Sequence, residues 1–282
     1  MNTESRNPRS FGLDRMSAKE IVRLMNEEEL IVWNVMKQAE EKLAVTAEKV
    51  AEAYLAGGRI VYVGAGTSGR IAAADAAEMP PTFGIPEDRF IAILAGGEAA
   101  QSHAVEHAED DEHAAITAIN QLRLTRKDVV IGLTASGRTP FVVAAVRHAR
   151  QKGVWTCGLS NSARAALLKE ADLGILLETG PEVLTGSTRL KAGTSQKLAL
   201  NRISTAAMVL VGKVIENLMV DVQANNRKLE ERCVRILRAL VKLSESEAWD
   251  LLRENDFNIR AAMEAYQATR QPGPATTVPT GG

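Results

Sequence analysis

The sequence lacks several features that would place it in a specialised class of protein. Only two of its 282 residues are cysteines, Cys157 and Cys233. Two such residues are too few for a disulfide framework and are not spaced like metal ligands, which favours the reducing environment of the cytoplasm. The three tryptophans are scattered along the chain, which is more typical of packing residues than of a stacking platform.

The sequence also lacks an excess of charge and a membrane-spanning run. Its 34 basic and 35 acidic residues give a net charge of −1, so electrostatics gives no reason to expect a nucleic acid or an anionic membrane surface as a partner. The most apolar helical stretch, residues 198–219, contains Arg202 and Lys213 and is therefore expected to be a buried helix. The polar first 14 residues show no apolar region of a secretory signal. We expect a cytoplasmic protein.

What the sequence does contain is a regular alternation of strand and helix patterns. Hydrophobic residues make up 45% of the chain and charged residues 24%, which allows a sizeable buried core. Short apolar, β-branched runs recur about every 25–40 residues, as in a parallel sheet covered by helices on both faces. We therefore predict an α/β fold with a doubly wound, five-stranded parallel sheet. The five expected strands are residues 59–64, 89–96, 128–135, 153–160 and 172–178.

Helical patterns flank the predicted sheet. Apolar residues spaced by three and four predict a helix over residues 17–56, which Gly57 and Gly58 end. A second long helix is expected from about residue 193 to residue 219, and a small helical subdomain over residues 236–269. The predicted division is an N-terminal helical segment (1–56), the sheet domain (57–220), a C-terminal helical subdomain (221–269) and a disordered Pro/Gly/Thr-rich tail (270–282).

Two glycine- and hydroxyl-rich segments follow predicted strands directly. They read VGAGTSGR over residues 63–70 and LTASGRTP over residues 133–140. Glycines let the backbone approach an anion, amides at the start of the next helix point toward it, and hydroxyl groups add donors. In parallel sheets ligands lie beyond the carboxyl ends of the strands, so we predict a phosphate site there. Its candidate ligands are Thr67, Ser68, Thr134, Ser136 and Thr139.

Other interpretations of these segments have less support. The first segment fits the G-x-G-x-x-G pattern of dinucleotide-binding folds, but such folds need an acidic residue at the end of the second strand. Here that strand ends in ILAGG, and Glu98 follows only after the glycines. Neither segment has the lysine of a Walker A motif. Tight turns without a ligand are a further alternative, which two hydroxyl-rich loops in one sheet disfavour.

Longer strings show which family the sequence resembles. The strings YVGAGTSGR, EMPPTFG, AEDD, TASGRTP and TGPEVLTGSTRLKAGTSQKLALN are similar to those of the N-acetylmuramic acid 6-phosphate etherase family, whose sugar isomerase (SIS) domain is related to glucokinase regulatory protein. The resemblance extends from RNP near the start to about residue 268. The sequence departs from the family pattern at Ala77 and Met79, where serine and cysteine are expected, and at Thr134. None of these departures removes a proposed chemical group.

The resemblance implies a carbon–oxygen lyase that needs no metal or other cofactor. The family cleaves the D-lactyl ether at C3 of N-acetylmuramic acid 6-phosphate and yields N-acetylglucosamine 6-phosphate and D-lactate, in cell-wall amino sugar recycling. Opening the sugar ring acidifies the C2 proton; a base removes it, an acid protonates the departing oxygen, and water adds to the double bond. By resemblance, Glu78 is the acid and Glu109 is the base. Apolar neighbours are expected to shield Glu78, and Pro80 and Pro81 to stiffen the chain after it.

The surroundings of Glu109 leave alternatives open. It lies in the charge run HAVEHAEDDEH, residues 103–113, and such runs are usually solvated surfaces. Within the same run, His103 and His107 have the spacing of a zinc-binding pair on a helix, although the signature is incomplete. The alternatives for the base are Glu106, Asp110 and Glu112.

The resemblance also places part of the sugar site in the segment GPEVLTGSTRLKAGTS, residues 180–195. Glu182 is the preferred contact, and the alternative is that the segment only links core elements. Other polar candidates in the segment are Ser187, Arg189 and Lys191. Arg138, in the second glycine segment, could face the phosphate or cap the sheet edge.

Single SIS domains usually complete their sugar site across a dimer, so the resemblance implies a homodimer. The candidate contacts are the helices over residues 21–55 and 196–219. Two alternative functions remain. An SIS aldose–ketose isomerase would have no need for the acid in EMPPTFG. A non-catalytic sugar-phosphate-sensing regulator of the SIS-repressor type would carry a basic helix-turn-helix, whereas the N-terminal helix here has the acidic run at residues 27–29.

Overall fold

The computed structural model describes residues 3–103 and 105–269, which form two compact units. The first unit contains the chain up to Met79 and Pro86–Val211, and the second contains Pro80–Ile85 and the chain from Gly212. All candidate site residues lie in the first unit. The predicted four-part division of the chain stays a prediction, and its tail lies outside the described residues.

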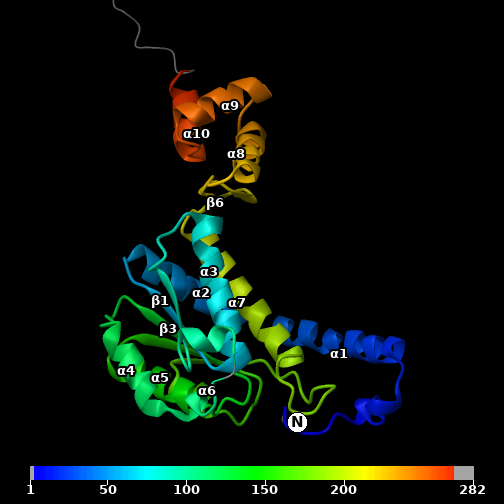
Figure 1. Ribbon diagram of the computed structural model, residues 1–282. Coiled ribbons are helices and arrows are strands. Elements are labelled where there is room, and N and C mark those ends of the chain that lie inside the picture. Colours follow the sequence, from blue (N-terminus) through cyan, green and yellow to red (C-terminus); the bar gives the residue numbers. More distant parts are fainter. Residues whose placement is uncertain (1–2, 104, 270–282) are drawn as a thin grey trace, which may run out of the picture. The chain divides into compact units, whose positions relative to one another are not determined.

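The first unit is built on a parallel sheet in which the strands follow the order β2-β1-β3-β4-β5. Figure 1 labels the central pair, β1 and β3. This sheet confirms the predicted α/β class and the five expected strands. The central strands β1 and β3 are buried along their whole length, because helices cover both faces of the sheet. The bounds are β1 Ile60–Gly64, β2 Phe90–Leu94, β3 Val129–Thr134, β4 Trp155–Ser160 and β5 Leu173–Leu176.

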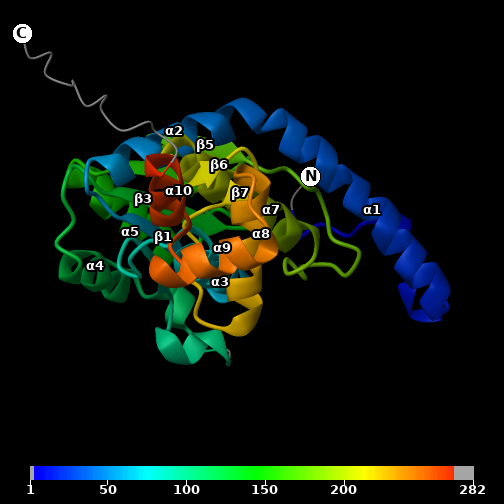
Figure 2. The same ribbon diagram turned by 90° about the horizontal axis from the view of Figure 1, so that it is seen from above.

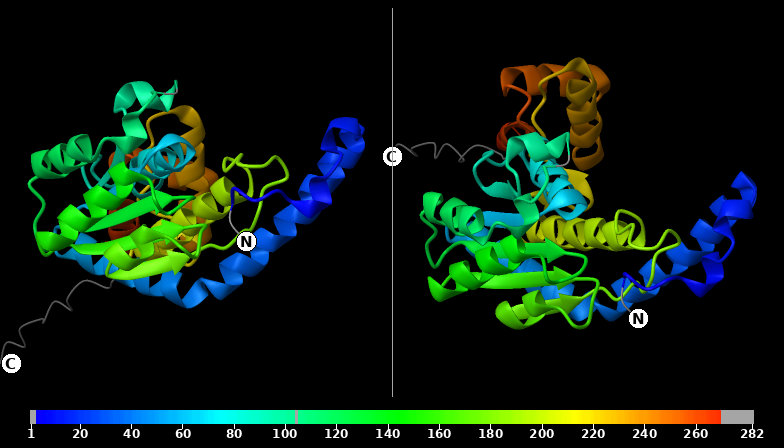
Figure 3. Two further views of the ribbon diagram at one scale, coloured as in Figure 1. Left: turned by 90° about the horizontal axis from the view of Figure 1, so that it is seen from below. Right: turned by 60° about the horizontal axis from the view of Figure 1, so that its bottom comes forward.

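The two faces of the sheet carry different helices (Figure 3). On one face, Val61, Val63 and Val130 pack against α4, α5 and α6 in a continuous apolar cluster. On the other face, Tyr62 and Cys157 contact side chains of α2 and α3, and α7 packs beside them. The bounds are α2 Glu40–Leu55, α3 Gly66–Phe83, α4 Glu112–Gln121, α5 Pro140–Gln151, α6 Ala166–Glu170 and α7 Lys191–Leu210.

The N-terminal helical segment, predicted as helical over residues 17–56, consists of two helices that meet at Ala39. A capping box between Ser17 and Glu20 starts α1, Ala18–Gln38, and the chain passes at Ala39 into α2. Helix α2 packs on the sheet, whereas α1 packs on α7 and extends away from the sheet (Figure 2). Before α1 lie two short 3₁₀ helices, η1 Pro8–Ser10 and η2 Leu13–Arg15.

Helix α7 ends at Leu210, so the expectation of a helix to residue 219 was wrong. Gly212 adopts a left-handed conformation with φ +80°, and a short hairpin follows, β6 Val214–Ile215 and β7 Leu218–Met219. In the second unit, three helices pack around an apolar core that includes Cys233 and Leu252. They are α8 Arg227–Leu240, α9 Glu245–Glu254 and α10 Ile259–Ala268. Within the described ranges, every helix is too short or too polar to span a membrane.

Candidate active site

The two predicted phosphate loops lie side by side. Strands β1 and β3 are neighbours, with Gly64 opposite Leu133, so the loops that follow them leave adjacent positions at the carboxyl edge of the sheet. In the strand order 2-1-3-4-5, this is the switch point at which successive crossovers go to opposite faces, and ligands of doubly wound sheets bind there. The expectation that both loops lie at the carboxyl ends of one sheet is confirmed.

The first loop depends on glycines that bring α3 close to β1. A Cβ on Gly64 would lie 2.6 Å from the nitrogen of Gly69, and a Cβ on Gly69 would lie 2.9 Å from the carbonyl oxygen of Gly64. Any larger residue at either position would push the helix away from the strand. The close approach fixes the start of α3 and places Thr67 and Ser68 in its first turn. The N–H groups of a first helical turn have no acceptor within the helix and can bind an anion.

The second loop gathers three hydroxyl groups at the start of α5. Thr134 Oγ1 lies 2.7 Å from Thr139 Oγ1 and 3.4 Å from Ser136 Oγ, and Ser136 Oγ accepts a hydrogen bond from the backbone of Arg138 at 3.2 Å. Gly137 has φ +67°, and a Cβ there would lie 2.1 Å from Ala165 Cβ. Clustered hydroxyls beside a helix start suit a tetrahedral oxyanion. The side chain of Arg138 is exposed.

Glu78 lies in the second half of α3, which continues through Pro80 and Pro81 to Phe83. Its side chain is exposed, while the adjacent Met79 is buried, so the expected shielding is absent within a single chain. Glu78 follows Thr67 by eleven residues on the same helix, a rise of about 16 Å. The structure therefore does not bring Glu78 beside the first loop of its own chain.

Glu109 lies on the short 3₁₀ helix η4, Ala108–Asp110, and is exposed. Ala108 packs against the apolar cluster that contains α5, so Glu109 lies near the helix that starts at the second loop. The guanidinium of Arg70 on α3 donates hydrogen bonds to the carbonyl oxygens of Gln101 (3.2 Å) and His103 (3.4 Å). These bonds tie the start of the Glu109 loop to the first turns of α3.

The interpretation of His103 and His107 as a zinc pair on a helix was wrong. His103 lies in a bend and His107 in a turn with φ +59°, so their spacing of four does not put them on one helical face. Short 3₁₀ turns, η3 Glu98–Gln101 and η4, replace the helix. In the part of the chain that the structure describes, no group of three or more His, Cys, Asp or Glu side chains could hold a metal ion.

Glu182 caps the start of α7. Its side chain is fully buried, and its carboxylate accepts hydrogen bonds from the backbone N–H groups of Lys191 (3.1 Å) and Ala192 (2.9 Å). Burial raises the pKa of Glu182, and those two hydrogen bonds oppose the rise in part. A Cβ on Gly193 would lie 3.4 Å from Thr67 Cγ2, so the start of α7 lies against the first loop. Direct contact of Glu182 with a sugar stays a prediction.

Comparison with known proteins shows which family the sequence belongs to. The model of the glucokinase regulatory protein N-terminal SIS domain matches residues 42–150. A protein named N-acetylmuramic acid 6-phosphate etherase from Histophilus somni (strain 129Pt) is 46% identical over 261 residues, which cover 93% of this chain and 86% of the relative. The chain belongs to the N-acetylmuramic acid 6-phosphate etherase family.

Two solved structures share the fold of this family member at low sequence identity. Phosphoheptose isomerase GmhA from Neisseria gonorrhoeae has a TM-score of 0.51 and 20% identity, over 68% of this chain and 98% of its own. The Vibrio vulnificus NanR protein complexed with ManNAc-6P has a TM-score of 0.51 and 18% identity, over 81% of this chain and 74% of its own. Similarity at this level shows the SIS-type fold alone.

Lys191, in the segment over residues 180–195 that was expected to form part of the sugar site, is buried rather than free to bind a ligand. It forms an ion pair with Glu28 of α1, and both side chains are 2% exposed. Asn7 and Arg9 also donate hydrogen bonds to Glu28, at 2.8 and 2.9 Å. Burial alone would raise the pKa of Glu28, but the hydrogen bond and charge of Lys191, followed by Asn7 and Arg9, outweigh it and lower that pKa. The network ties the N-terminal segment and α1 to the start of α7.

The structure shows two buried polar clusters that sequence reasoning missed. Asp75 of α3 accepts hydrogen bonds from Tyr62, Asn201 and Ser204. Asn161, after β4, donates to Ser195 Oγ of α7 at 2.8 Å. The only sequence signal for Asp75 was a single acid among the alanines of AAADAAE, and its partners are far apart in the sequence.

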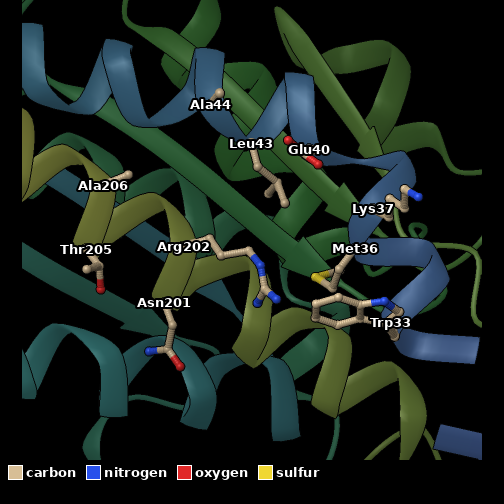
Figure 4. A pocket seen from close by; sticks show the side chains of 10 residues that line it. All are labelled: Trp33, Met36, Lys37, Glu40, Leu43, Ala44, Asn201, Arg202, Thr205 and Ala206. Carbon is tan, nitrogen blue, oxygen red and sulfur yellow. The ribbon is translucent and has the colours of Figure 1, made fainter. Parts of the chain in front are cut away.

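A hollow of about 730 Å³ lies between α1, α2 and α7 (Figure 4). Trp33 and Met36 of α1 lie on one side, opposite Arg202 and Asn201 of α7. Trp33 is 66% exposed in the single chain, and it lies on the helical segment expected to contact a second copy. The other lining residues are Lys37, Glu40, Leu43, Ala44, Thr205 and Ala206.

Proposed function

We propose that this chain cleaves the D-lactyl ether of N-acetylmuramic acid 6-phosphate and yields N-acetylglucosamine 6-phosphate and D-lactate. The observation that carries the proposal is the 46% identity to an etherase over 93% of the chain. The site supports it independently, because two hydroxyl-bearing loops meet at the switch point of the sheet, where sheets of this kind bind ligands.

The substrate phosphate binds at the two loops. The hydroxyls of Thr134, Ser136 and Thr139 already lie close together, with Thr134 at 2.7 and 3.4 Å from the other two, and the starts of α3 and α5 add backbone N–H donors. A sugar phosphate as substrate agrees with the fold, since NanR, which shares it, binds ManNAc-6P. Glu182 and Lys191 support this site by fixing the start of α7 beside Thr67.

The reaction proceeds by elimination followed by addition of water. The ring opens to the C1 aldehyde, which acidifies the proton on C2. The carboxylate of Glu109 takes that proton, the carboxyl group of Glu78 protonates the C3 oxygen as D-lactate leaves, and a double bond forms between C2 and C3. Water then adds its hydroxyl group at C3, and C2 regains a proton. Each positioned proton transfer contributes roughly 10²–10⁴-fold to the rate.

The functional unit is a homodimer. Apolar side chains of α1, among them Val22, Leu30 and Trp33, are between 57% and 68% exposed in the single chain, and Trp33 borders the hollow against α7. A second copy would cover this surface. It would also provide a way to shield the exposed Glu78 and to bring a glutamate to the first loop, which lies about 16 Å along α3 from Glu78 of the same chain.

The reaction belongs to the recycling of cell-wall amino sugars in the cytoplasm. An aldose–ketose isomerase and a sugar-phosphate-sensing regulator have weaker support. An isomerase uses one acid–base group at C1 and C2 and gives no role to Glu78. A sensor needs neither glutamate.

Isotope labelling of the products tests the proposal. The chain is incubated with N-acetylmuramic acid 6-phosphate in ¹⁸O- and deuterium-labelled water. We expect D-lactate without ¹⁸O and N-acetylglucosamine 6-phosphate with ¹⁸O at C3 and deuterium at C2. Label in lactate would indicate attack on the lactyl carbon. Deuterium at C2 of a sugar that retains its lactyl group would indicate an isomerase-type enzyme that removes the C2 proton without eliminating lactate. No turnover, with binding intact, would indicate a sensor.

A further inference from the structure

Asp75 is a buried carboxylate on the helix that carries Glu78. Only 8% of it is exposed. It accepts hydrogen bonds from the Tyr62 hydroxyl of β1 (3.0 Å), the Asn201 amide of α7 (2.9 Å) and the Ser204 hydroxyl of α7 (3.2 Å). One side chain therefore joins three elements: β1, which leads into the first phosphate loop; α3, which carries Glu78; and α7, whose start lies against Thr67.

The spacing of Asp75 and Glu78 couples their positions. Three residues of an α-helix correspond to a rise of about 4.5 Å and a separation of about 60° around the axis. Any rotation or sliding of α3 that moved Asp75 would therefore move the Glu78 side chain with it. The three hydrogen bonds oppose both motions, because their donors lie on two different neighbouring elements.

The turn of α3 around Glu78 lacks two backbone hydrogen bonds, although its two prolines restrict their own φ angles. Pro80 and Pro81 lie inside α3 and have no N–H, so the carbonyl groups of Ala76 and Ala77 lack their usual helical donors. The backbone ladder alone therefore holds this turn less firmly than an ordinary helical turn. The Asp75 contacts lie just before this turn, where an additional anchor has the largest effect on Glu78.

Packing alone does not explain a carboxylate at this position. Burying an ionisable group is costly unless hydrogen bonds compensate, and an apolar side chain of similar size would often be as stable. Burial raises the pKa of Asp75 above its ordinary value of 3.8, although hydrogen bonds from Tyr62, Asn201 and Ser204 oppose the rise. What an apolar residue could not provide is a directional link to two elements at once.

We propose that Asp75 is a positioning residue that aims Glu78 at the departing C3 oxygen. The inference rests on the proposed function, in which Glu78 acts in the elimination but not in the removal of the C2 proton. Asp75 should therefore affect one of two measurable events, the release of lactate, and leave the other, exchange of the C2 hydrogen with solvent, nearly unchanged. A purely structural role would lower both together.

Asp75→Asn tests this prediction. The substitution keeps the size of the side chain but replaces one acceptor oxygen with a donor NH₂ group, which then faces a donor of Tyr62 or α7. We expect lactate release to fall roughly 10- to 100-fold, as for a misplaced catalytic group, while exchange at C2 stays within about threefold. Ser204→Ala removes a single hydrogen bond and should act in the same direction with a smaller effect, so it tests the proposal if Asp75→Asn does not fold.

Asp128→Asn is the matched control. Asp128 is 3% exposed and accepts hydrogen bonds from the backbone N–H groups of Arg59 (2.7 Å) and Thr125 (2.6 Å), but it lies at the amino end of β3, opposite the loops. This variant should lower the melting temperature and keep the wild-type ratio of exchange to lactate release.

The outcomes separate the two proposals. If the wild type releases lactate and the Asp75→Asn or Ser204→Ala variant loses exchange and release to the same extent, the positioning role is overturned. Unchanged lactate release in a folded Asp75→Asn variant also overturns it. A wild-type chain that releases no lactate overturns the proposed function, and the positioning role with it.

Discussion

The hydroxyl oxygens of Thr134 and Thr139 lie 2.7 Å apart across the turn that starts α5. Ser136 completes the group at 3.4 Å from Thr134, so a phosphate could accept hydrogen bonds from several of these hydroxyls. The hydrogen bond between the two threonines holds their hydroxyls in place beside the helix start.

Thr139→Ala should therefore weaken substrate binding. Loss of one hydrogen bond to a charged group costs about 1.5–3 kcal/mol, so we expect KM to rise by roughly 10- to 100-fold while kcat falls less. Steady-state kinetics of lactate release measures both values. Thr117→Ala removes an exposed hydroxyl on α4 and should leave KM unchanged. Equal KM values for the two variants would show that Thr139 does not contact the phosphate.

Gly137→Ala should destabilise the chain and disrupt the second loop. Gly137 has φ +67°, and a Cβ would lie 2.1 Å from Ala165 Cβ and 2.5 Å from Ser160 Oγ. Gly57 provides the control, since it has φ +83° but a Cβ there would meet no atom within 4 Å. The left-handed conformation costs about 1–2 kcal/mol at either position. Any additional decrease in the free energy of unfolding for Gly137→Ala therefore measures the steric clash. Chemical denaturation should show a clearly larger loss for Gly137→Ala, and equal losses would contradict the loop geometry.

Glu28→Gln should destabilise the chain in a pH-dependent way. Breaking a buried ion pair by removing one partner costs about 3–5 kcal/mol, and Glu28 and Lys191 are each 2% exposed. Because the pKa of Glu28 is lowered from its ordinary value of 4.5, its ionised form stabilises the fold above that value. This contribution is lost as the pH falls through the lowered folded-state pKa.

Urea unfolding of wild type and Glu28→Gln at several pH values measures this effect. The difference in unfolding free energy between the wild type and Glu28→Gln should be largest near neutral pH and should decrease as the pH falls below 4.5. The double variant Glu28→Gln/Lys191→Met should recover part of the loss, because no buried charge is then left unpaired. A difference independent of pH would show that the ion pair is not the source of the stability.

Trp33→Glu should dissociate the proposed homodimer. Trp33 is 66% exposed in the single chain, and a carboxylate in an apolar interface is strongly disfavoured. Sedimentation velocity should show a dimer for the wild type and a monomer for Trp33→Glu, while Thr117→Glu on α4 should remain dimeric. A wild-type monomer that is fully active would contradict the dimer proposal.

Much of the fold follows from local patterns in the sequence. The strands were predictable because each is a short apolar run between glycines or charged turn residues, and such runs in a doubly wound sheet are buried on both faces. The end of α7 was misplaced because its apolar pattern continues past Gly212. The left-handed Gly212 is nevertheless a common end signal for a helix.

The site was predictable only in part. The loops could be found because glycine and hydroxyl residues follow two strands directly, and the strand order then places them together. The roles of Glu182 and Asp75 could not be found in this way. Glu182 bonds the backbone nine residues along the chain, and Asp75 bonds a serine 129 residues away, so both roles depend on tertiary contacts that periodicity does not encode.

Exchange of the C2 hydrogen in Glu78→Gln and Glu109→Gln tests the two-glutamate chemistry most directly. Each variant is incubated with N-acetylmuramic acid 6-phosphate in deuterated water, and deuterium at C2 and free lactate are measured together. We predict that Glu78→Gln incorporates deuterium but releases almost no lactate, whereas Glu109→Gln does neither. Exchange that survives in Glu109→Gln and disappears in Glu78→Gln would contradict the assignment of base and acid.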